Sequence, residues 1–337
     1  MSDGAGASGG QGQILSVLGL LKRKPAAAGD KAGGPKAPFK QRLLAWWEGV
    51  EVPPPDHKPA AKEEAAPEPP PPLVKLEPWE TPAIKVVHAI WGEGFNSPGG
   101  TAFVLELVRP FAINNSMSIL DFGCGAGGGL RAITKEFDVW TTGVERDKAM
   151  AEVGKVLSTR AGLERKAEVQ LYDHENFVSR QGGYDCILSK EMIYKFDQRD
   201  VILARLENNL KTRGQLTIAD YLRGDKTAPD DPLLKAAFGN APPLWTKAEY
   251  EKRFTELKFD LRVSEDITDK YRAMALEALD QVTRVREGKS VIRTFPEDFL
   301  NEVESWGRRI AAMEAGALRV FRFYGIKMGS SSLMSNW

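Results

Sequence analysis

Residues 119–129 read ILDFGCGAGGG, an apolar run that continues into a turn with glycine at positions 123, 125, 127, 128 and 129. Glycine loses more backbone entropy on folding than any other residue, so a stretch this rich in glycine is expected where the backbone turns tightly or approaches a ligand closely. A strand that enters such a turn is typical of the first unit of a doubly wound α/β sheet. Ligands of these folds bind beyond the carboxyl ends of the strands, so the segment predicts both a fold class and a binding site.

The sequence around the glycine turn alternates between strand-like and helical patterns. Segments rich in β-branched residues are separated by amphipathic stretches of helical length, which predicts a mostly parallel sheet with helices on both faces. We expect a helical cap at 73–115 and a domain at 116–328, with a helical substrate lid at about 224–316. The expected strands are 116–122, 139–145, 166–173, 184–190, 214–221, 259–264 and 317–327, with two long helices between the last two.

Residues 1–72 differ from the rest of the chain in composition. They are rich in Gly, Ala, Pro and Lys, and a segment with so few apolar residues cannot bury enough surface to fold, which predicts a disordered tail. Two short amphipathic segments, 13–24 and 39–50, are exceptions. Each could pack on the folded domain, or residues 13–50 could attach the protein to a membrane surface or a protein partner.

Composition and charge argue against several classes of function. The 337 residues carry 46 basic and 46 acidic side chains, and this neutral balance argues against a nucleic-acid partner. Cys124 and Cys186 lack metal-ligand spacing, so we expect no metal site, reduced thiols and a cytoplasmic location, with the periphery of a membrane as a second location. No apolar run approaches the roughly 18 residues of a membrane-spanning helix, and residues 1–10 lack a secretory signal pattern.

The spacing of the glycines narrows the class of ligand. Gly123, Gly125 and Gly127 give G-x-G-x-G, which differs from the G-x-G-x-x-G of dinucleotide-binding turns, and no phosphate-binding lysine follows. Glu145 ends the second expected strand, where a carboxylate can accept hydrogen bonds from ribose hydroxyls. Asp173 ends the third strand and can accept from an adenine amino group. Together these positions predict a nucleoside ligand without a phosphate chain.

This combination, D-x-G-x-G-x-G followed by two strand-end carboxylates, resembles the class I S-adenosylmethionine-dependent methyltransferases. The resemblance implies a Rossmann-like sheet of seven strands, mostly parallel, with the last strand antiparallel. Segments at 90–108 (IWGEGFNSPGGTAFVLELV), 172–196, 218–222 (IADYL) and 304–310 (ESWGRRI) are similar to the phosphoethanolamine N-methyltransferase family. The resemblance implies S-adenosylmethionine as the cofactor, bound by Asn96, Ser97, Asp121, Gly123, Gly125, Gly127, Glu145, Arg146, Asp173, His174, Ser189 and Lys190.

The resemblance breaks on the acceptor side of the predicted site. The family's catalytic Tyr and His correspond here to Trp79 and Lys195, and two of its phosphate-binding positions fall near residues 240 and 242, where neither residue type is present. Tyr221 is retained, and Arg309 replaces a Lys with another cation. Trp79, Tyr221 and Arg309 are therefore the expected substrate-binding residues, while the family's own substrate is not carried over.

Two residues after the fourth expected strand are candidates for catalysis. Glu191 corresponds to an Asp of the family and could hold a cationic acceptor, or it could cap the segment that follows the strand. Lys195 could remove a proton from an amine if burial lowered its pKa by several units, or it could lie on a solvated helix face. The four tryptophans at 79, 91, 245 and 306 could form a cage for a cationic substrate or pack in the core.

The sequence therefore predicts S-adenosylmethionine-dependent methyl transfer to a small molecule or a lipid headgroup. A nitrogen acceptor is favoured, and an oxygen or carbon acceptor comes second. The alternative is a catalytically inactive cofactor-binding module, recruited to a membrane or a protein complex through the N-terminal tail, because the family's Tyr and His are missing.

Overall fold

The computed structural model describes residues 81–172 and 182–329. Several predictions lie outside the described residues: the tail at 1–72 with its segments at 13–24 and 39–50, and the site residues Trp79, Asp173 and His174.

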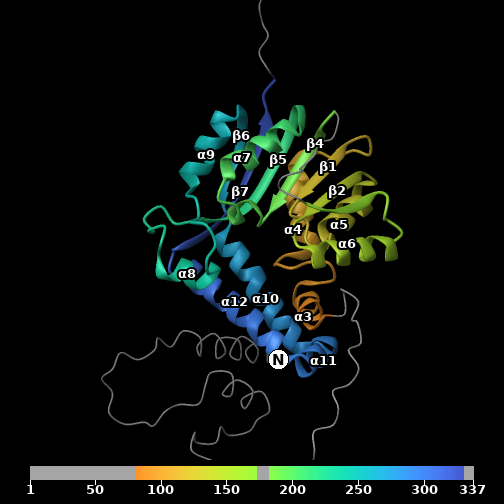
Figure 1. The fold of residues 1–337 in the computed structure, drawn as a ribbon, viewed down its shortest axis with the longest axis vertical. Helices are drawn as coiled ribbons and strands as arrows, with labels where there is room; N and C mark the ends of the chain where they lie inside the picture. The colour runs from red at the N-terminus through yellow and green to blue at the C-terminus, as the bar shows by residue number, and fades with distance from the viewer. Residues whose placement is uncertain (1–80, 173–181, 330–337) are drawn as a thin grey trace, which may run out of the picture. The chain divides into compact units, whose positions relative to one another are not determined.

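Seven strands of the described residues form one sheet, in the order β3-β2-β1-β4-β5-β7-β6 (Figure 1). β7 pairs antiparallel with β5 and β6, and the other neighbouring strands pair in parallel. This topology confirms the predicted Rossmann-like class I fold. The strands are β1 (Ser118–Phe122), β2 (Trp140–Glu145), β3 (Ala167–Leu171), β4 (Tyr184–Lys190), β5 (Leu210–Arg223), β6 (Phe259–Asp266) and β7 (Leu318–Lys327).

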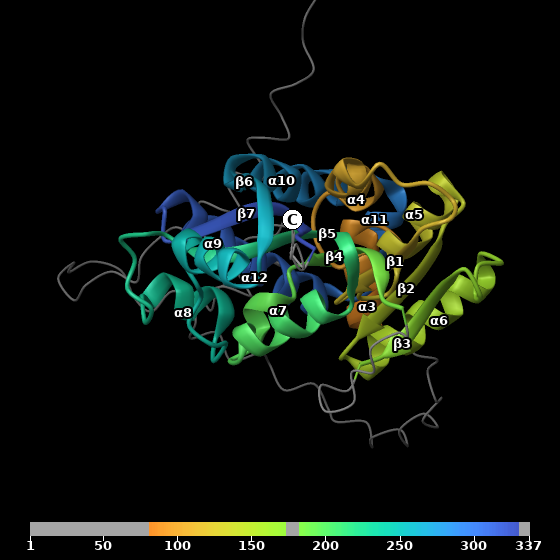
Figure 2. The same ribbon diagram turned by 90° about the horizontal axis from the view of Figure 1, so that it is seen from above.

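Helices cover both faces of the sheet. α5 (Gly128–Phe137) and α6 (Lys148–Arg160) contribute to one apolar cluster, while α7 (Arg199–Asn208) and α9 (Lys247–Glu256) contribute to the cluster on the other face. Figure 2 shows α5 and α7 on opposite sides of the strands. All five residues of β1 are buried, as expected for a central parallel strand covered on both faces.

A further group of helices lies beyond the carboxyl ends of the strands. α3 (Pro82–Trp91) packs against α10 (Thr268–Arg284), α11 (Arg286–Thr294) and α12 (Pro296–Glu314), although these elements are far apart in the sequence (Figure 1). α8 (Pro232–Phe238) packs against α12. Segments from both ends of the described chain therefore meet over the same edge of the sheet.

The last two strands of the chain are separated by three helices instead of the expected two. Val285 has an extended backbone, with φ −81° and ψ 149°, and separates α10 from α11. Pro296 then occupies the first position of α12, where proline needs no hydrogen-bonded N–H. The remaining elements are α4 (Gly100–Val108) and two short 3-10 turns, η2 (Arg109–Phe111) and η3 (Ile193–Lys195).

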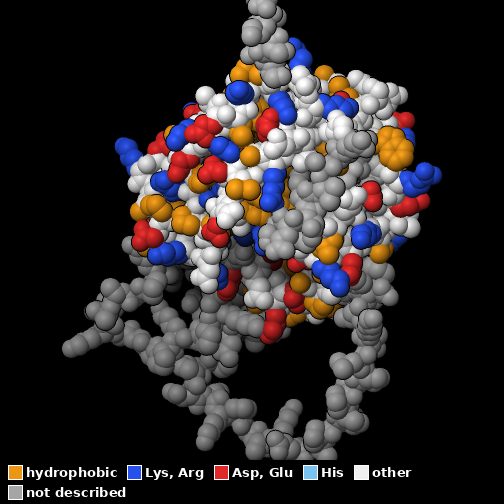
Figure 3. Space-filling model, turned by 45° about the horizontal axis from the view of Figure 1, so that its top comes forward, with side chains coloured by type: hydrophobic (Ala, Val, Ile, Leu, Met, Phe, Trp, Pro, Cys, Tyr) orange, Lys and Arg blue, Asp and Glu red, His pale blue; other side chains and the backbone are white. Residues whose placement is uncertain are grey.

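Charged side chains of both signs are interspersed on the face of the molecule drawn in Figure 3. Among the helices in 81–172 and 182–329, none is both long and apolar enough to cross a membrane.

The order of the strands places the predicted site. The chain moves from β1 outward through β2 and β3, and then returns to the other side of β1 as β4. Ligands of open α/β sheets bind at such a switch point, beyond the carboxyl ends of the strands. The residues that follow β1, β2 and β4 therefore lie where a ligand is expected.

Candidate active site

The glycine turn after β1 is held against the neighbouring strand. The backbone N–H groups of Gly123 and Cys124 donate to the carbonyl oxygen of Val144, at 2.9 and 3.2 Å. Gly123 has φ +89°, and a Cβ at this position would lie 2.5 Å from Met192. Only glycine fits here, because the positive φ and the close approach both exclude a side chain.

Glu145, at the end of β2, is buried and bound to backbone on both sides. Its Oε2 accepts from the N–H of Gly125 at 2.9 Å, and its Oε1 accepts from the N–H of Asp147 at 2.8 Å. A carboxylate offers about four lone-pair positions, so each oxygen keeps capacity to accept a further hydrogen bond. Asp147 itself accepts from the N–H of Met150 and begins α6.

Asp121 lies beside this carboxylate, near the end of β1. Burial raises the pKa of Asp121 to about 7; Lys190 acts to lower this pKa, and Glu145 adds to the rise. The group therefore changes charge near neutral pH, which is unusual for an aspartate.

The loop between α3 and α4 covers the glycine turn. The carbonyl oxygen of Gly94 accepts from the N–H of Gly128 at 3.0 Å, which fixes the loop on the first turn of α5. The side chain of Asn96 lies over Gly125, since a Cβ on Gly125 would meet the Asn96 amide at 3.1 Å. Lys190 donates a hydrogen bond to the buried hydroxyl of Ser97 and joins the loop to the end of β4.

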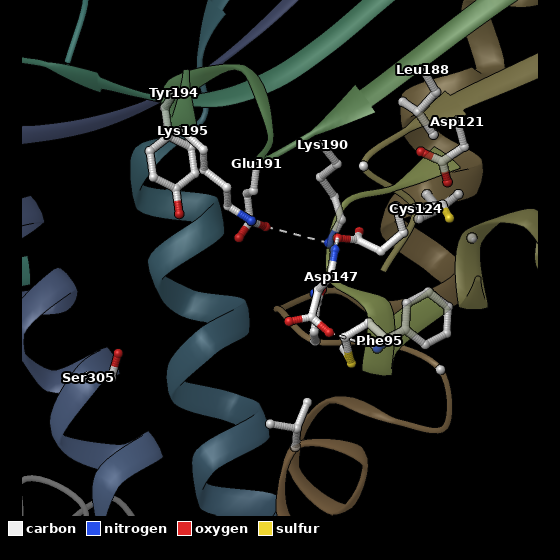
Figure 4. Close-up of a pocket in the computed structure, with 18 of the residues that line it drawn as sticks. Phe95, Asp121, Cys124, Asp147, Leu188, Lys190, Glu191, Tyr194, Lys195 and Ser305 are labelled. Atoms are coloured by element: carbon white, nitrogen blue, oxygen red, sulfur yellow. Dashed lines mark hydrogen bonds and ion pairs between the residues drawn. The ribbon is translucent and has the colours of Figure 1, made fainter. Parts of the chain in front are cut away.

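A cavity of about 350 Å³, the inner chamber, lies between these elements and α12 (Figure 4). It is bordered by the predicted site residues Asn96, Asp121, Gly123, Glu145, Lys190, Glu191, Lys195 and Arg309. The predicted residues Ser97, Gly125, Gly127, Arg146, Ser189 and Tyr221 do not border it. The structure thus brings eight of the fourteen described site residues together around one space, and the other six lie outside its border.

Two of these six residues have recognisable contacts. The Ser189 hydroxyl donates to the carbonyl oxygen of Phe122 at 3.0 Å and links β4 to β1. The guanidinium of Arg146 lies 5.4 Å from the ring centroid of Phe196, which follows η3. These contacts order the ends of the strands on which the chamber is built.

Glu191 follows β4 and is the most constrained acidic residue of the chamber. Its φ of +54° is in the left-handed region, which is uncommon for a residue with a side chain and is often found at functional sites. Tyr271 donates to its Oε1, and the Tyr221 hydroxyl donates to its Oε2 at 3.1 Å. Figure 4 shows Lys190 beside it, and the Lys190 Nζ lies 3.5 Å from Oε1. Burial acts to raise the pKa of Glu191, but Lys190 and the hydrogen bonds outweigh burial and hold this pKa below its usual value.

Sequence reasoning missed Tyr271. This residue comes from α10, far along the chain from Glu191, and no local motif marks it. Its side chain is completely buried, and its ring lies 6.1 Å from that of Tyr221. Only the packing of α10 over the sheet brings the two tyrosines to the same carboxylate.

The short turn that carries Tyr194 and Lys195 is held by a buried aspartate of β5. Asp220 accepts from the N–H of Tyr194 at 2.8 Å and from the Tyr250 hydroxyl at 2.7 Å. The Lys195 side chain is exposed, with Nζ 5.7 Å from the Tyr194 ring centroid. The burial that the proton-removal hypothesis for Lys195 requires is therefore absent.

Arg309 lies across the chamber on α12. It donates to the Ser305 hydroxyl at 3.0 Å, and its guanidinium lies 5.0 Å from the ring centroid of Trp306. Trp306 in turn packs on Trp91 with ring centroids 4.7 Å apart, and both indoles donate to Glu302.

Of the four tryptophans proposed for a cage, the structure describes those at 91, 245 and 306, and these three do not line one cavity. Trp245 packs on Tyr250 and lies outside the inner chamber, whereas Trp306 borders it. The cage hypothesis is therefore wrong for Trp245.

The sequence of the chain matches a known protein family. The family model described as a methyltransferase domain matches residues 100–279, more than half of the chain. The chain belongs to this methyltransferase family. The prediction of a class I S-adenosylmethionine-dependent methyltransferase, made from the glycine turn and the strand-end carboxylates, is confirmed.

Curated relatives of this methyltransferase include phosphoethanolamine N-methyltransferases. Phosphoethanolamine N-methyltransferase 3 of Arabidopsis thaliana is 27% identical over 240 residues, which cover 71% of this chain and 48% of the relative. The phosphoethanolamine N-methyltransferase of Plasmodium falciparum is 24% identical over 230 residues, covering 67% of this chain and 85% of the relative. The chain spans about half the length of the plant relatives it matches.

Solved structures share the fold of the methyltransferase at low sequence identity. Phosphoethanolamine N-methyltransferase 2 of Haemonchus contortus, in complex with phosphomonomethylethanolamine and S-adenosylhomocysteine, superposes with a TM-score of 0.66 at 21% identity, covering 74% of this chain and 59% of that chain. Geranyl diphosphate C-methyltransferase of Streptomyces coelicolor gives a TM-score of 0.53 at 12% identity, covering 68% and 76%.

The inner chamber of the methyltransferase fits S-adenosylmethionine, the cofactor of this family. Its volume is within the roughly 300–1,000 Å³ typical of small-ligand sites. Glu145 keeps acceptor capacity for ribose hydroxyls, and the carboxylate of Asp121 faces the same space, where it suits a cationic sulfonium.

Proposed function

We propose that the protein transfers the methyl group of S-adenosylmethionine to a nitrogen of a small molecule or a lipid headgroup. The observation that carries the proposal is Glu191, a mostly buried carboxylate that borders the same chamber as Glu145 and the glycine turn. A cationic or amine acceptor held at Glu191 would lie beside the predicted cofactor site.

When bound, S-adenosylmethionine would supply a methyl group already activated for transfer to the lone pair of a neutral nitrogen, leaving S-adenosylhomocysteine. An ammonium acceptor would first lose its proton to water, because a protonated nitrogen has no lone pair. The protein's own contribution is alignment and exclusion of water. Such positioning can account for about 7–11 kcal/mol of a reaction barrier. Asn96 and the loop bonded to Lys190 cover the chamber and serve this purpose.

The electrostatics of Glu191 favour nitrogen over a hydroxyl acceptor. Since its pKa is held below the usual value, Glu191 is ionised at neutral pH and is a weak base. A carboxylate of this kind suits an ammonium or a methylated amine as an ion partner, and an ammonium can lose its proton to water before transfer, whereas the far less acidic hydroxyl calls for a strong base beside it. Tyr221 and Tyr271 hold the carboxylate in place.

The names of the relatives agree with a nitrogen acceptor, while the acceptor residues of this chain differ. Phosphoethanolamine N-methyltransferases are N-methylating enzymes by name. Lys195 stands where their catalytic His is expected, and Arg309 stands where a Lys is expected. We therefore propose a related amine and not the same substrate.

A direct test measures the release of S-adenosylhomocysteine from S-adenosylmethionine with panels of amines, phosphorylated amines, phospholipids, hydroxyl acceptors and proteins. We expect turnover with a class of small amine or amine headgroup, and loss of turnover in Glu191→Gln. Turnover only with hydroxyl acceptors or only with protein would contradict the proposal. Cofactor binding without turnover on any acceptor would support the alternative of an inactive module.

A further inference from the structure

A second cavity, the outer chamber, adjoins the inner chamber and is more open to solvent. Its volume is about 810 Å³, more than twice that of the inner chamber. Four residues border both cavities: Tyr194, Lys195, Ser305 and Arg309. We call these four residues the neck, because they are common to the borders of both cavities. The rest of the outer chamber is formed by residues 235–242 and Arg308.

The charged residues of the two chambers differ in sign. Those that border the outer chamber are all cations, namely Lys195, Lys235, Arg308 and Arg309. Carboxylates outnumber cations around the inner chamber, where they are Asp121, Glu145, Asp147, Glu191 and Glu302. A ligand that spans the neck is therefore favoured with a cationic or amine end inside and an anionic group farther out.

The neck has the donors to bind an anion. Lys235 and Arg308 are already near carboxylates, at 3.8 Å from Asp230 and 3.2 Å from Glu304. Neither neck cation forms an ion pair within 81–172 and 182–329, and the buried Nε of Arg309 has no hydrogen-bond partner there. Two unpaired cations suit a phosphate group, and their number does not separate a monoester from a diester, so the space beyond the neck decides between the two.

The outer chamber continues past the neck along an apolar wall. Ala236, Ala237, Phe238, Ala241 and Pro242 form this wall. An anion at the neck must therefore be a link within a longer molecule if the ligand is to fill the space. A carboxylate ends a chain, whereas a phosphodiester carries one negative charge and continues on both sides. A phosphomonoester amine would leave the outer chamber empty.

We propose that the methyl acceptor is an amine joined to a phosphodiester, with the amine at Glu191, the phosphodiester at the neck and a further substituent in the outer chamber. This inference rests on the proposed function and specifies its substrate class. The substituent could belong to a membrane phospholipid or to a water-soluble diester, and the chemistry at the neck is the same for both.

The activity test compares three acceptors: phosphoethanolamine, glycerophosphoethanolamine and dihexanoylphosphatidylethanolamine. We expect kcat/KM to be at least about tenfold higher for one of the diesters than for the monoester, equivalent to about 1.4 kcal/mol. A preference for the dihexanoyl compound identifies a lipid acceptor, and a preference for the glycerol compound identifies a soluble one. Equal or better use of the monoester would overturn the inference.

A variant that fills the outer chamber tests the same point by a different route. Ala241→Trp adds a large side chain to the apolar wall, and Ala161→Trp, at the exposed end of α6, is the matched control. We expect Ala241→Trp to raise KM for the diesters by a factor at least about tenfold larger than the factor for the monoester. An equal effect on all three acceptors, or no effect, would contradict the inference.

A binding measurement separates this inference from the proposed function. Glycerophosphocholine and phosphocholine, which are already fully methylated, are titrated into the protein loaded with S-adenosylhomocysteine. Tighter binding of the diester that is lost in Ala241→Trp and kept in Ala161→Trp supports the outer chamber as a binding site. If no acceptor is methylated in the same preparation, only the proposed function fails. Tighter binding of the monoester overturns the inference.

Discussion

The inner and outer chambers are built from different parts of the fold and differ in charge. The inner chamber is formed largely by strand ends and the loops that follow them, and its charged lining is mainly acidic. The outer chamber is formed by α8, the segment after it and α12, and its charged lining is basic. We propose from this difference that the strand ends bind the cofactor and the reacting amine, and that the helices determine which group attached to the amine is accepted.

The largest expected effect comes from the carboxylate that we place at the reacting amine. Glu191→Gln keeps the shape of the side chain and removes its charge, so we expect turnover to fall roughly 30-fold to 1,000-fold, equivalent to about 2–4 kcal/mol. S-adenosylmethionine affinity is expected to change little. Steady-state rates and calorimetry measure the two quantities.

Glu302→Gln is the matched control for this prediction. Glu302 borders the same chamber, but its carboxylate accepts from two indoles. We expect its effect on turnover to stay below about tenfold. Equal losses of turnover in the two variants would show that Glu191 contributes no more to the reaction than another carboxylate of the inner chamber.

Tyr271 belongs to helix α10, but its hydroxyl donates to Glu191 of the inner chamber. This hydrogen bond stabilises the charged form of Glu191. Tyr271→Phe removes this donor, so the pKa of Glu191 should rise and the acidic limb of the pH–rate profile should move to higher pH. We expect kcat to fall about tenfold, equivalent to about 1.4 kcal/mol.

Tyr324→Phe is the control, since the Tyr324 hydroxyl bonds Pro110 and borders neither chamber. We expect it to leave the pH–rate profile unchanged. A Tyr271→Phe profile with the same acidic limb as the wild type would mean that the tyrosine only packs.

We expect the affinity for S-adenosylmethionine to depend on pH through Asp121 of the inner chamber. Its pKa of about 7 means that the side chain is mostly neutral at pH 6 and mostly charged at pH 8. A charged carboxylate favours the sulfonium cation, so S-adenosylmethionine should bind about 5–10-fold more tightly at pH 8 than at pH 6. Calorimetry at several pH values measures this change.

S-adenosylhomocysteine controls for the rest of the cofactor, because it has the same amino acid part and a neutral sulfur. We expect the difference in pH dependence between the two ligands to disappear in Asp121→Asn. A difference that persists in this variant would assign the titration to another group.

The smallest effect is expected in the loop over the inner chamber. Ser97→Ala removes the hydrogen bond with Lys190 and should weaken S-adenosylmethionine binding about 2–10-fold, the usual range for a single hydrogen bond. Ser264→Ala removes a hydroxyl that bonds Glu251 away from both chambers, and it should have no effect. Unchanged affinity in Ser97→Ala would show that the loop is held by its backbone contacts alone.

The sequence was informative wherever function depends on local backbone. The turn at Gly123 and the carboxylate of Glu145 follow directly from strands, and the spacing of glycines records the close approach of the backbone. The strands were predicted because segments rich in β-branched residues alternate with amphipathic segments of helical length, and the antiparallel last strand was implied by the family resemblance. The tail and the residues Asp173 and His174 lie outside the described residues, so their predicted roles stay predictions.

The acceptor side could not be predicted in the same way. Tyr271 reaches Glu191 only because α10 packs over the sheet, and Arg309 borders the same chamber as Lys195 only because α12 lies over the same edge of the sheet. Such contacts join residues far apart in the chain, and no local pattern encodes them. The exposure of Lys195 also depends on tertiary packing. Proton removal by this residue required a buried side chain, and the side chain is exposed.

The most direct test of the account is calorimetric titration of S-adenosylmethionine and S-adenosylhomocysteine into the wild type and Glu145→Gln. The variant keeps an oxygen acceptor for one backbone N–H and loses the charge that we expect to hold the ribose, and thermal unfolding shows whether it is folded. We predict binding of both ligands to the wild type and at least about tenfold weaker binding of both to the variant. No binding to the wild type, or equal binding to a folded Glu145→Gln, would contradict the assignment of the inner chamber.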